Sequence, residues 1–345
     1  MIRRLYLLAI ASLTMVLLVM TAGSIVRMSG AGMGCPDWPK CFGYYIPPTD
    51  VETLTWREGK SFKKGQMILH EERFLVAQFD LTSGERFNPE NWEVYTRHDY
   101  THFDPLHTWI EYINRLIGAL TGIPVLLFFL LSIAYVRKDA LVTLLGFLGV
   151  FFLGFSAWLG KLVVDGNLVP HSITYHMFSA LALVAIYAYL IGRLQVYTLS
   201  FRSKRDSNIT RLAWVCMALL LLQIFLGTFV REEVDIIARQ GSLERSMWIE
   251  SLSWIFKVHR SFSILVLGGI GLLAYWIIRM RGVSAWPRIL LALVILEILA
   301  GMALAYLNMP AIVQPIHLIF AAFTFAVLVY VTVQYYRKTS SDVTS

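Results

Sequence analysis

Hydrophobic residues occur along the chain in eight long runs, separated by shorter polar segments. Each run is close to or above the roughly 18 residues that an α-helix needs to cross the hydrocarbon core of a bilayer. The runs cover residues 5–26, 106–134, 140–160, 174–191, 212–230, 255–278, 289–307 and 313–335. This pattern predicts an all-α integral membrane protein with eight transmembrane helices and one large extracytoplasmic loop between the first two.

Composition supports this prediction. Hydrophobic residues make up 57% of the chain and charged residues only 15%, far from the balance of a soluble domain. Arg3 and Arg4 precede the first run, as they would in a signal peptide. However, the run is long for a signal sequence and lacks a clear cleavage site of small residues. We therefore expect it to be retained as a helix.

The distribution of charge predicts the topology. The two termini and the short connections at residues 135–139, 193–211 and 279–288 together hold fourteen Lys/Arg and three Asp/Glu, whereas residues 27–105 hold nine and twelve. Lys and Arg concentrate in cytoplasmic loops, so we expect a multi-pass protein of the cell inner (cytoplasmic) membrane with both termini in the cytoplasm. The net charge of +7 then follows from topology, and no nucleic-acid partner is expected.

The ends of the first and fifth runs share a motif. The first ends in Gly23-Ser-Ile-Val-Arg27 and the fifth in Gly227-Thr-Phe-Val-Arg231, an offset of 204 residues. A repeat of this kind indicates that the chain contains two related halves.

Further positions support two halves of four helices each. In the second and sixth runs the repeat pairs Asn114 with His259. Three other pairs share an offset of 141: Gly160 with Gly301, Asn167 with Asn308, and His176 with His317. An even number of spans per half predicts parallel repeats. We expect two four-helix bundles, residues 1–195 and 196–345, each with a site in its core.

Four histidines lie near the outer ends of the even-numbered runs: His107, His176, His259 and His317. Ionisable side chains are costly in a membrane and usually face a bundle interior. Hydrogen bonds between helices are one explanation, and zinc would require about four close ligands per site. A porphyrin iron needs only two axial imidazoles, so we predict heme, with His259 and His317 as the complete pair.

Glu111 is the acidic residue best placed for chemistry in the first half. It shares one helix face with His107 and Asn114, at spacings of i, i+4 and i+7 that span about 10.5 Å. A carboxylate at this depth is expensive unless it is paired or functional. Glu111 is therefore either a catalytic, proton-handling residue or the partner of Arg115, and we favour the first.

Four arginines lie near the outer ends of the spans, where the topology rule does not require them: Arg27, Arg115, Arg231 and Arg260. Their guanidinium groups can bind heme propionates through paired hydrogen bonds. Snorkelling of the side chains to the interface is the alternative.

These residues together resemble the heme A synthase family over nearly the whole chain. The resemblance depends on Gly34-Cys-Pro-Asp-Trp-Pro-Lys-Cys41-Phe-Gly43, Glu111-Tyr-Ile-Asn-Arg115, His176, His259-Arg260 and His317. It implies an oxidoreductase that converts the C8 methyl group of heme O to the formyl group of heme A, for assembly of cytochrome oxidase. It also implies heme O synthase and oxidase assembly proteins as partners, and an electron acceptor that the sequence does not identify.

The resemblance also assigns roles to single residues. His259 and His317 would hold a heme b in the second half, and His176 would ligate heme O in the first half, with Glu111 near the reacting edge. Cys35 and Cys41 lie on the oxidising side of the membrane, where a disulfide can form. This pair would either brace the loop or relay redox equivalents.

The sequence departs from the family pattern at Asn114, where many members have a second histidine in the substrate half. Either His107 takes its place as a ligand of heme O, which would displace the heme outward, or His176 holds the iron alone. Two other functions stay open: a heme chaperone, which the parallel repeat suggests, and a diheme b-type electron carrier, for which Asn114 leaves no obvious complete first site. Both would return heme unchanged, whereas an enzyme would not.

Overall fold

In the computed structural model, the described residues are 1–97, 103–165, 172–198, 206–241, 244–281 and 285–336. Eight of their helices are long and apolar enough to cross a membrane, which confirms the predicted all-α, multi-pass class. They are α1 (Ile2–Ser29), α2 (Pro105–Ile133), α3 (Ala140–Asp165), α4 (Ser172–Thr198), α5 (Ser207–Gln240), α6 (Trp254–Arg281), α7 (Ala285–Tyr306) and α8 (Val313–Tyr336).

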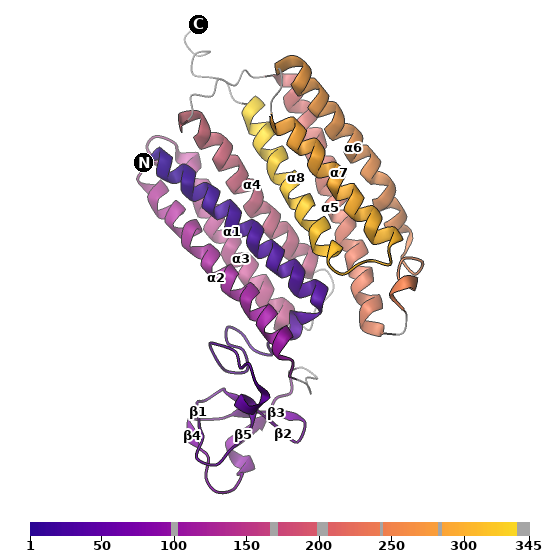
Figure 1. Cartoon of the computed structure of the whole chain (residues 1–345). Helices are drawn as coiled ribbons and strands as arrows, with labels where there is room; N and C mark the ends of the chain where they lie inside the picture. Colours follow the sequence, from indigo (N-terminus) through magenta and orange to yellow (C-terminus); the bar gives the residue numbers. More distant parts are fainter. Residues whose placement is uncertain (98–102, 166–171, 199–205, 242–243, 282–284, 337–345) are drawn as a thin grey trace.

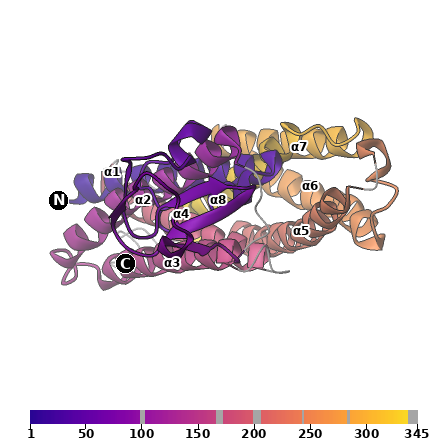
Figure 2. The same ribbon diagram turned by 90° about the horizontal axis from the view of Figure 1, so that it is seen from below.

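The helices form two groups, α1–α4 and α5–α8, that lie side by side (Figures 1 and 2). Helices α4 and α8 are the inner members and pack on each other, and α8 also contacts α1 and α5. Within their spans, 61% and 67% of the central segment is buried, against 17–33% in the other six. The other helices present apolar side chains such as Leu127 and Leu130 outward, as a bilayer requires.

Local signals determine where the helices begin and end. The Asp104 carboxylate accepts hydrogen bonds from the backbone N–H groups of Leu106 and His107 and thereby caps α2. At the end of α1, Gly30 adopts a left-handed conformation with φ of 75°, which glycine tolerates best. Helix α5 continues ten residues beyond the predicted apolar run and ends before Gly241, also left-handed, with φ of 60°.

The outer loop is a small folded module, and the sequence analysis did not predict its strands. A three-stranded sheet has the order β2-β3-β5, and β1 pairs with β4. The strands are β1 (Ser61–Phe62), β2 (Met67–His70), β3 (Arg73–Ala77), β4 (Leu81–Thr82) and β5 (Trp92–Val94). Figure 1 places this module at the end of the α1–α4 group opposite the chain's N-terminus.

One turn explains why the hairpin was missed. Strands β2 and β3 are joined by Glu71 and Glu72, with φ of 49° and 60°. Two-residue hairpin turns with positive φ at both positions usually contain Asn-Gly or Asp-Gly. Two glutamates give no such signal in the sequence.

Candidate functional site

The second half brings His259 of α6 and His317 of α8 together, as predicted. Their ring centroids are 6.4 Å apart and the ring planes are nearly perpendicular, at 85°. Metal–imidazole bonds are about 2 Å long, so two nitrogens on opposite sides of one metal ion lie about 4 Å apart. The centroid of each ring lies farther from the metal than the ligating nitrogen does, by about the radius of the ring. The observed separation is close to the one expected for two imidazoles on opposite sides of one metal ion.

A glycine on a neighbouring helix faces each of these rings. A methyl group at Gly227 of α5 would lie 3.1 Å from Cε1 of His259, and one at Gly301 of α7 would lie 3.2 Å from Cε1 of His317. These separations are shorter than ordinary van der Waals contact, so larger residues would push the rings aside. The two glycines thus leave the space that the Cε1 edges of the imidazoles occupy.

The hydrogen bonds of the two rings suit axial ligation. Nδ1 of His317 is 2.9 Å from the backbone carbonyl oxygen of Glu297. A carbonyl can only accept, so Nδ1 donates and Nε2 keeps its lone pair for a metal. Nδ1 of His259 is buried and has no hydrogen-bond partner among the described residues. The donor set therefore fits a heme with two imidazole ligands.

The first half repeats this arrangement with one substitution. A methyl group at Gly23 of α1 would lie 3.6 Å from Oδ1 of Asn114, and one at Gly160 of α3 would lie 3.8 Å from Cε1 of His176. Both Oδ1 of Asn114 and Nδ1 of His176 are buried without a partner in the described part of the chain. The matching glycine contacts in both halves support the repeat, which stays a prediction. Asn167, one of its predicted members, lies outside the described residues.

His107 has different surroundings. It lies in the first turn of α2 with 39% of its side chain exposed, and its Nδ1 is 3.4 Å from the Asp104 carboxylate. Within the described ranges, no ring contact joins it to His176, unlike the pair in the second half. Ligation of heme O by His107 stays a prediction.

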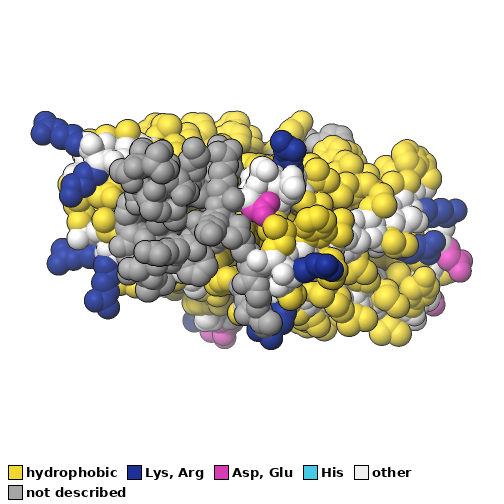
Figure 3. Space-filling model, turned by 90° about the horizontal axis from the view of Figure 1, so that it is seen from above, with side chains coloured by type: hydrophobic (Ala, Val, Ile, Leu, Met, Phe, Trp, Pro, Cys, Tyr) yellow, Lys and Arg dark blue, Asp and Glu magenta, His cyan; other side chains and the backbone are white. Residues whose placement is uncertain are grey.

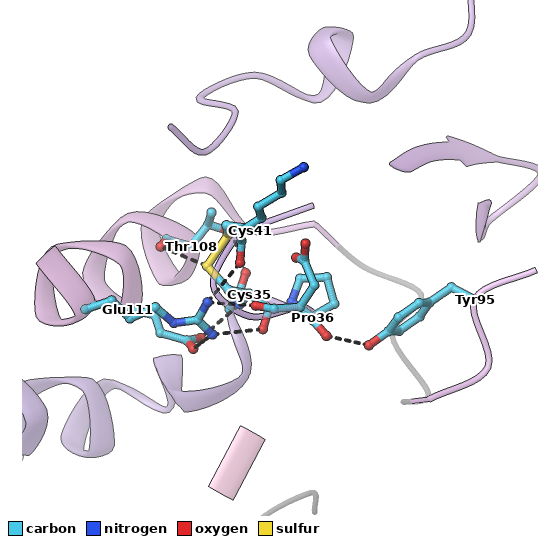
Figure 4. A network of polar contacts seen from close by, with 10 residues as sticks. Cys35, Pro36, Cys41, Tyr95, Thr108 and Glu111 are labelled. Carbon is cyan, nitrogen blue, oxygen red and sulfur yellow. Dashed lines mark hydrogen bonds and ion pairs between the residues drawn. A yellow bond between two sulfur atoms is a disulfide. The ribbon is translucent and has the colours of Figure 1, made fainter. Parts of the chain in front are cut away.

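Glu111 anchors the cysteine loop to α2 (Figure 4). It is 3% exposed; its Oε2 accepts a hydrogen bond of 2.8 Å from the backbone N–H of Cys35, and its Oε1 pairs with Arg115 at 2.5 Å. The Thr108 hydroxyl donates to the carbonyl of Gly34 at 2.9 Å. Cys35 and Cys41 form a disulfide. The predicted catalytic carboxylate therefore lies directly beneath the disulfide loop.

Arg115 holds the same loop from its other side. Its guanidinium group donates to the carbonyl oxygens of Asp37 at 2.7 Å and Lys40 at 3.0 Å. Tyr95, from the segment after β5, donates to the carbonyl of Pro36 at 2.6 Å. The contacts of Arg115 are with Glu111 and the loop, so its predicted role toward a propionate gains no support from this geometry.

Gly34 allows the loop to approach α2 closely. A methyl group at this position would lie 2.5 Å from the carbonyl oxygen of His107, and backbone cannot move aside as a flexible side chain can. We expect Gly34→Ala to displace the loop and to lower stability by about 1–3 kcal/mol. Thermal unfolding and limited proteolysis of the loop measure this. Gly84→Ala is the control because open space surrounds that glycine; equal stability of the two variants would contradict the prediction.

Asp37 makes the stability of the protein depend on pH. Its Oδ2 accepts from the backbone N–H of Gly43 at 2.9 Å, and Oδ1 is buried without a partner among the described atoms. Burial raises the pKa of the Asp37 carboxyl above its ordinary value of 3.8. The folded state thus binds the carboxyl proton more tightly than the unfolded state does. The free energy of unfolding therefore falls as the pH rises from the pKa of the unfolded state toward the pKa of the folded state. We expect Asp37→Asn to be more heat-stable than the wild type at neutral pH, with the difference fading below about pH 4; a constant difference would contradict this.

The arginines of the two halves meet at the outer ends of the helices. Nε of Arg27 donates to Oδ2 of Asp235 at 2.9 Å, and Arg231 pairs with Oδ1 of Asp235 at 2.7 Å. Arg231 also donates to Gln314 of α8. Arg260 is not part of this cluster; it is exposed, and its guanidinium carbon lies 5.8 Å from the ring centroid of Phe256.

Two acidic residues of the second half were missed in the sequence. Glu297 of α7 is 7% exposed, and its Oε2 has no partner in the described ranges. A single carboxylate inside an apolar run was the signal that could have found it. Asp235 follows the predicted end of the fifth span and looked like an ordinary loop residue.

These features define a class: a multi-pass helical membrane protein with imidazoles from different helices paired inside it. Sequence comparison then gives the family. The profile described as "Cytochrome oxidase assembly protein" (COX15-CtaA) matches residues 6–76 and 88–329. The chain belongs to this family.

Individual relatives are similar over most of their length. A protein of Shewanella oneidensis named heme A synthase is 24% identical, over 96% of this chain and 96% of the relative. Proteins with the same name from Wolbachia pipientis wMel and Ehrlichia canis are 22% and 23% identical, over 95% and 91% of this chain and 92% and 88% of their own lengths.

Proposed function

We propose that the protein is a heme A synthase, an oxidoreductase that converts the C8 methyl group of heme O to a formyl group. The facing imidazoles of His259 and His317 carry this proposal, since they form a pair with the spacing that a heme iron needs. The relatives named heme A synthase support it over nearly the full chain.

The second half, residues 196–345, is the proposed heme b domain. His259 and His317 would be the axial ligands, with Gly227 and Gly301 against the Cε1 edges of their rings. A bound heme supplies reversible one-electron chemistry. The hydrogen bond from His317 to the Glu297 carbonyl would hold that ring in the tautomer and orientation that ligation requires.

The first half, residues 1–195, is the proposed heme O domain. His176 would ligate the substrate, and the buried Oδ1 of Asn114 would face it from α2. Glu111 lies one turn from Asn114 on the same helix, so its carboxylate would lie near the edge of a substrate bound there. The disulfide loop covers this carboxylate and would limit access of water.

The reaction needs both electron and proton acceptors. Conversion of a methyl group and one water to a formyl group releases four electrons and four protons; the electrons pass to an acceptor outside this chain. Glu111 is the proposed proton acceptor. Arg115 and the Cys35 N–H group would stabilise its anionic form between proton transfers, and Cys35–Cys41 would brace the loop that carries this N–H.

Location and partners follow from the same proposal. The protein would lie in the cell inner membrane with both termini in the cytoplasm. Figure 3, the view from above, shows Lys and Arg side chains gathered at the left-hand end of the molecule; a concentration of positive charge at cytoplasmic helix ends would fit this orientation. A heme O synthase would supply the substrate, and cytochrome oxidase assembly proteins would receive the product.

Chromatography of hemes from cells that make heme O, with and without this chain, tests the proposal. We expect a new heme with a formyl group only when the chain is present. A diheme electron carrier or heme chaperone would leave heme O unchanged, and that result would overturn the enzymatic proposal.

A further inference from the structure

Asp235 joins two arginines that belong to different halves. Its Oδ2 accepts from Nε of Arg27, on α1, at 2.9 Å, and its Oδ1 pairs with Arg231, on α5, at 2.7 Å. Arg231 also donates to the carbonyl oxygen of Arg27 at 3.4 Å. All three side chains are largely buried, with exposures of 25%, 15% and 25% for Arg27, Asp235 and Arg231. One carboxylate therefore serves both halves at their outer ends.

Each arginine lies one helical turn from the glycine that faces the buried site of its own half. Arg27 follows Gly23, which faces Asn114, and Arg231 follows Gly227, which faces His259. Residues four apart share a helix face and lie about 6 Å apart along it. The guanidinium groups are thus just outward of the two sites, at the depth where a carboxylate on a bound heme would meet them.

The charges of this cluster do not cancel. Two guanidinium groups share one carboxylate, Arg245 adds a further positive charge nearby, and Nε of Arg231 has no partner among the described residues. One further carboxylate could accept a hydrogen bond from this Nε of Arg231. A second added carboxylate would have to compete with Asp235 for one of the two arginines. A buried carboxylate without a cationic partner would be costly.

We propose that Asp235 is a shared counter-ion that propionates displace, and that it couples heme binding in the two halves. This inference rests on the proposed function. A heme b propionate on Arg231 shifts Asp235 entirely to Arg27, where it opposes capture of a heme O propionate. The occupied second half thereby weakens binding in the first half and favours release of the product. Asp235 is a positioning residue in this scheme and does not contact reacting atoms.

Absorbance titrations of the purified full chain with heme O test the coupling. In the wild type, we expect heme O to bind about five- to tenfold more weakly when heme b is present than in His317→Ala protein without it. In Asp235→Asn protein this difference should disappear, and both KM and kcat should fall because product leaves more slowly. The dimethyl ester of heme O, which has no propionate charge, should bind equally to wild type and Asp235→Asn.

Glu233→Gln is the matched control. Glu233 lies two residues from Asp235 but bonds to Ser253, at 3.0 Å to its N–H and 2.5 Å to its hydroxyl. We expect it to keep the wild-type coupling. A coupling unchanged in Asp235→Asn, or weaker heme O binding in that variant, would overturn the inference and leave a purely structural clamp.

Three outcomes distinguish failure of this inference from failure of the proposed function. If Asp235→Asn does not fold, the comparison of wild type with His317→Ala decides, and equal affinities for heme O would overturn the inference. If the wild type converts heme O but shows no coupling, only this inference fails. If it neither binds nor converts heme O, the proposed function fails as well.

Discussion

His317→Ala protein is expected to lose the resident low-spin heme. Alanine removes one of the two facing imidazoles, and the remaining His259 cannot complete a pair with any other described ring near it. A heme whose free concentration is roughly a hundred times its dissociation constant stabilises the folded state by about 3 kcal/mol. Loss of this heme should therefore lower the thermal stability as well. The absorption and electron paramagnetic resonance spectra of purified protein measure the loss.

His259→Ala should behave in the same way because it removes the other half of the pair. His70→Ala is the control, since His70 lies in the outer module, where it stacks on Phe87 with ring centroids 4.1 Å apart. A low-spin spectrum that persists in His317→Ala would contradict the assignment of this pair as ligands.

Glu111→Gln is expected to retain the heme of the second half and to lose most of the conversion of heme O. Glutamine has nearly the shape of glutamate but cannot accept a proton at neutral pH. Loss of a positioned acid or base typically lowers turnover by about 10²- to 10⁴-fold. Quantifying the formyl product per bound heme measures the effect, and product formation near the wild-type rate would remove Glu111 from the mechanism.

A structural effect of this substitution can be separated from a chemical one. Asp139→Asn disrupts another buried ion pair, in which Arg193 donates to both carboxylate oxygens at 2.7 and 2.8 Å. We expect it to lower stability without changing turnover per folded protein. The disulfide Cys35–Cys41 should also stay resistant to alkylation in Glu111→Gln; reactive thiols there would mean that the loop has detached.

The spans and the ring pair could be predicted because they depend on composition and spacing. An apolar run of about 20 residues has few alternatives to a membrane helix, and a histidine inside one is costly enough to need a partner. The offset between His176 and His317 pointed to equivalent helices. In the structure, α4 and α8 are the two most buried spans, while the repeat itself stays a prediction.

Contacts between distant segments could not be predicted in the same way. The sequence places Glu111 near Arg115, but nothing in the spacing reveals that the N–H of Cys35 meets the same carboxylate. Asp235 was missed because the fifth apolar run ends at residue 230, while α5 extends to Gln240. The ion pair of Arg231 with Asp235, four residues apart, supports the helix beyond the apolar run.

Mass spectrometry of the hemes bound to protein purified from cells that make heme O tests the central claim most directly. We expect heme b together with a heme O derivative in which one oxygen has replaced two hydrogens, the change from methyl to formyl. Recovery of heme b with only unchanged heme O would contradict the proposed synthase and favour a carrier of heme.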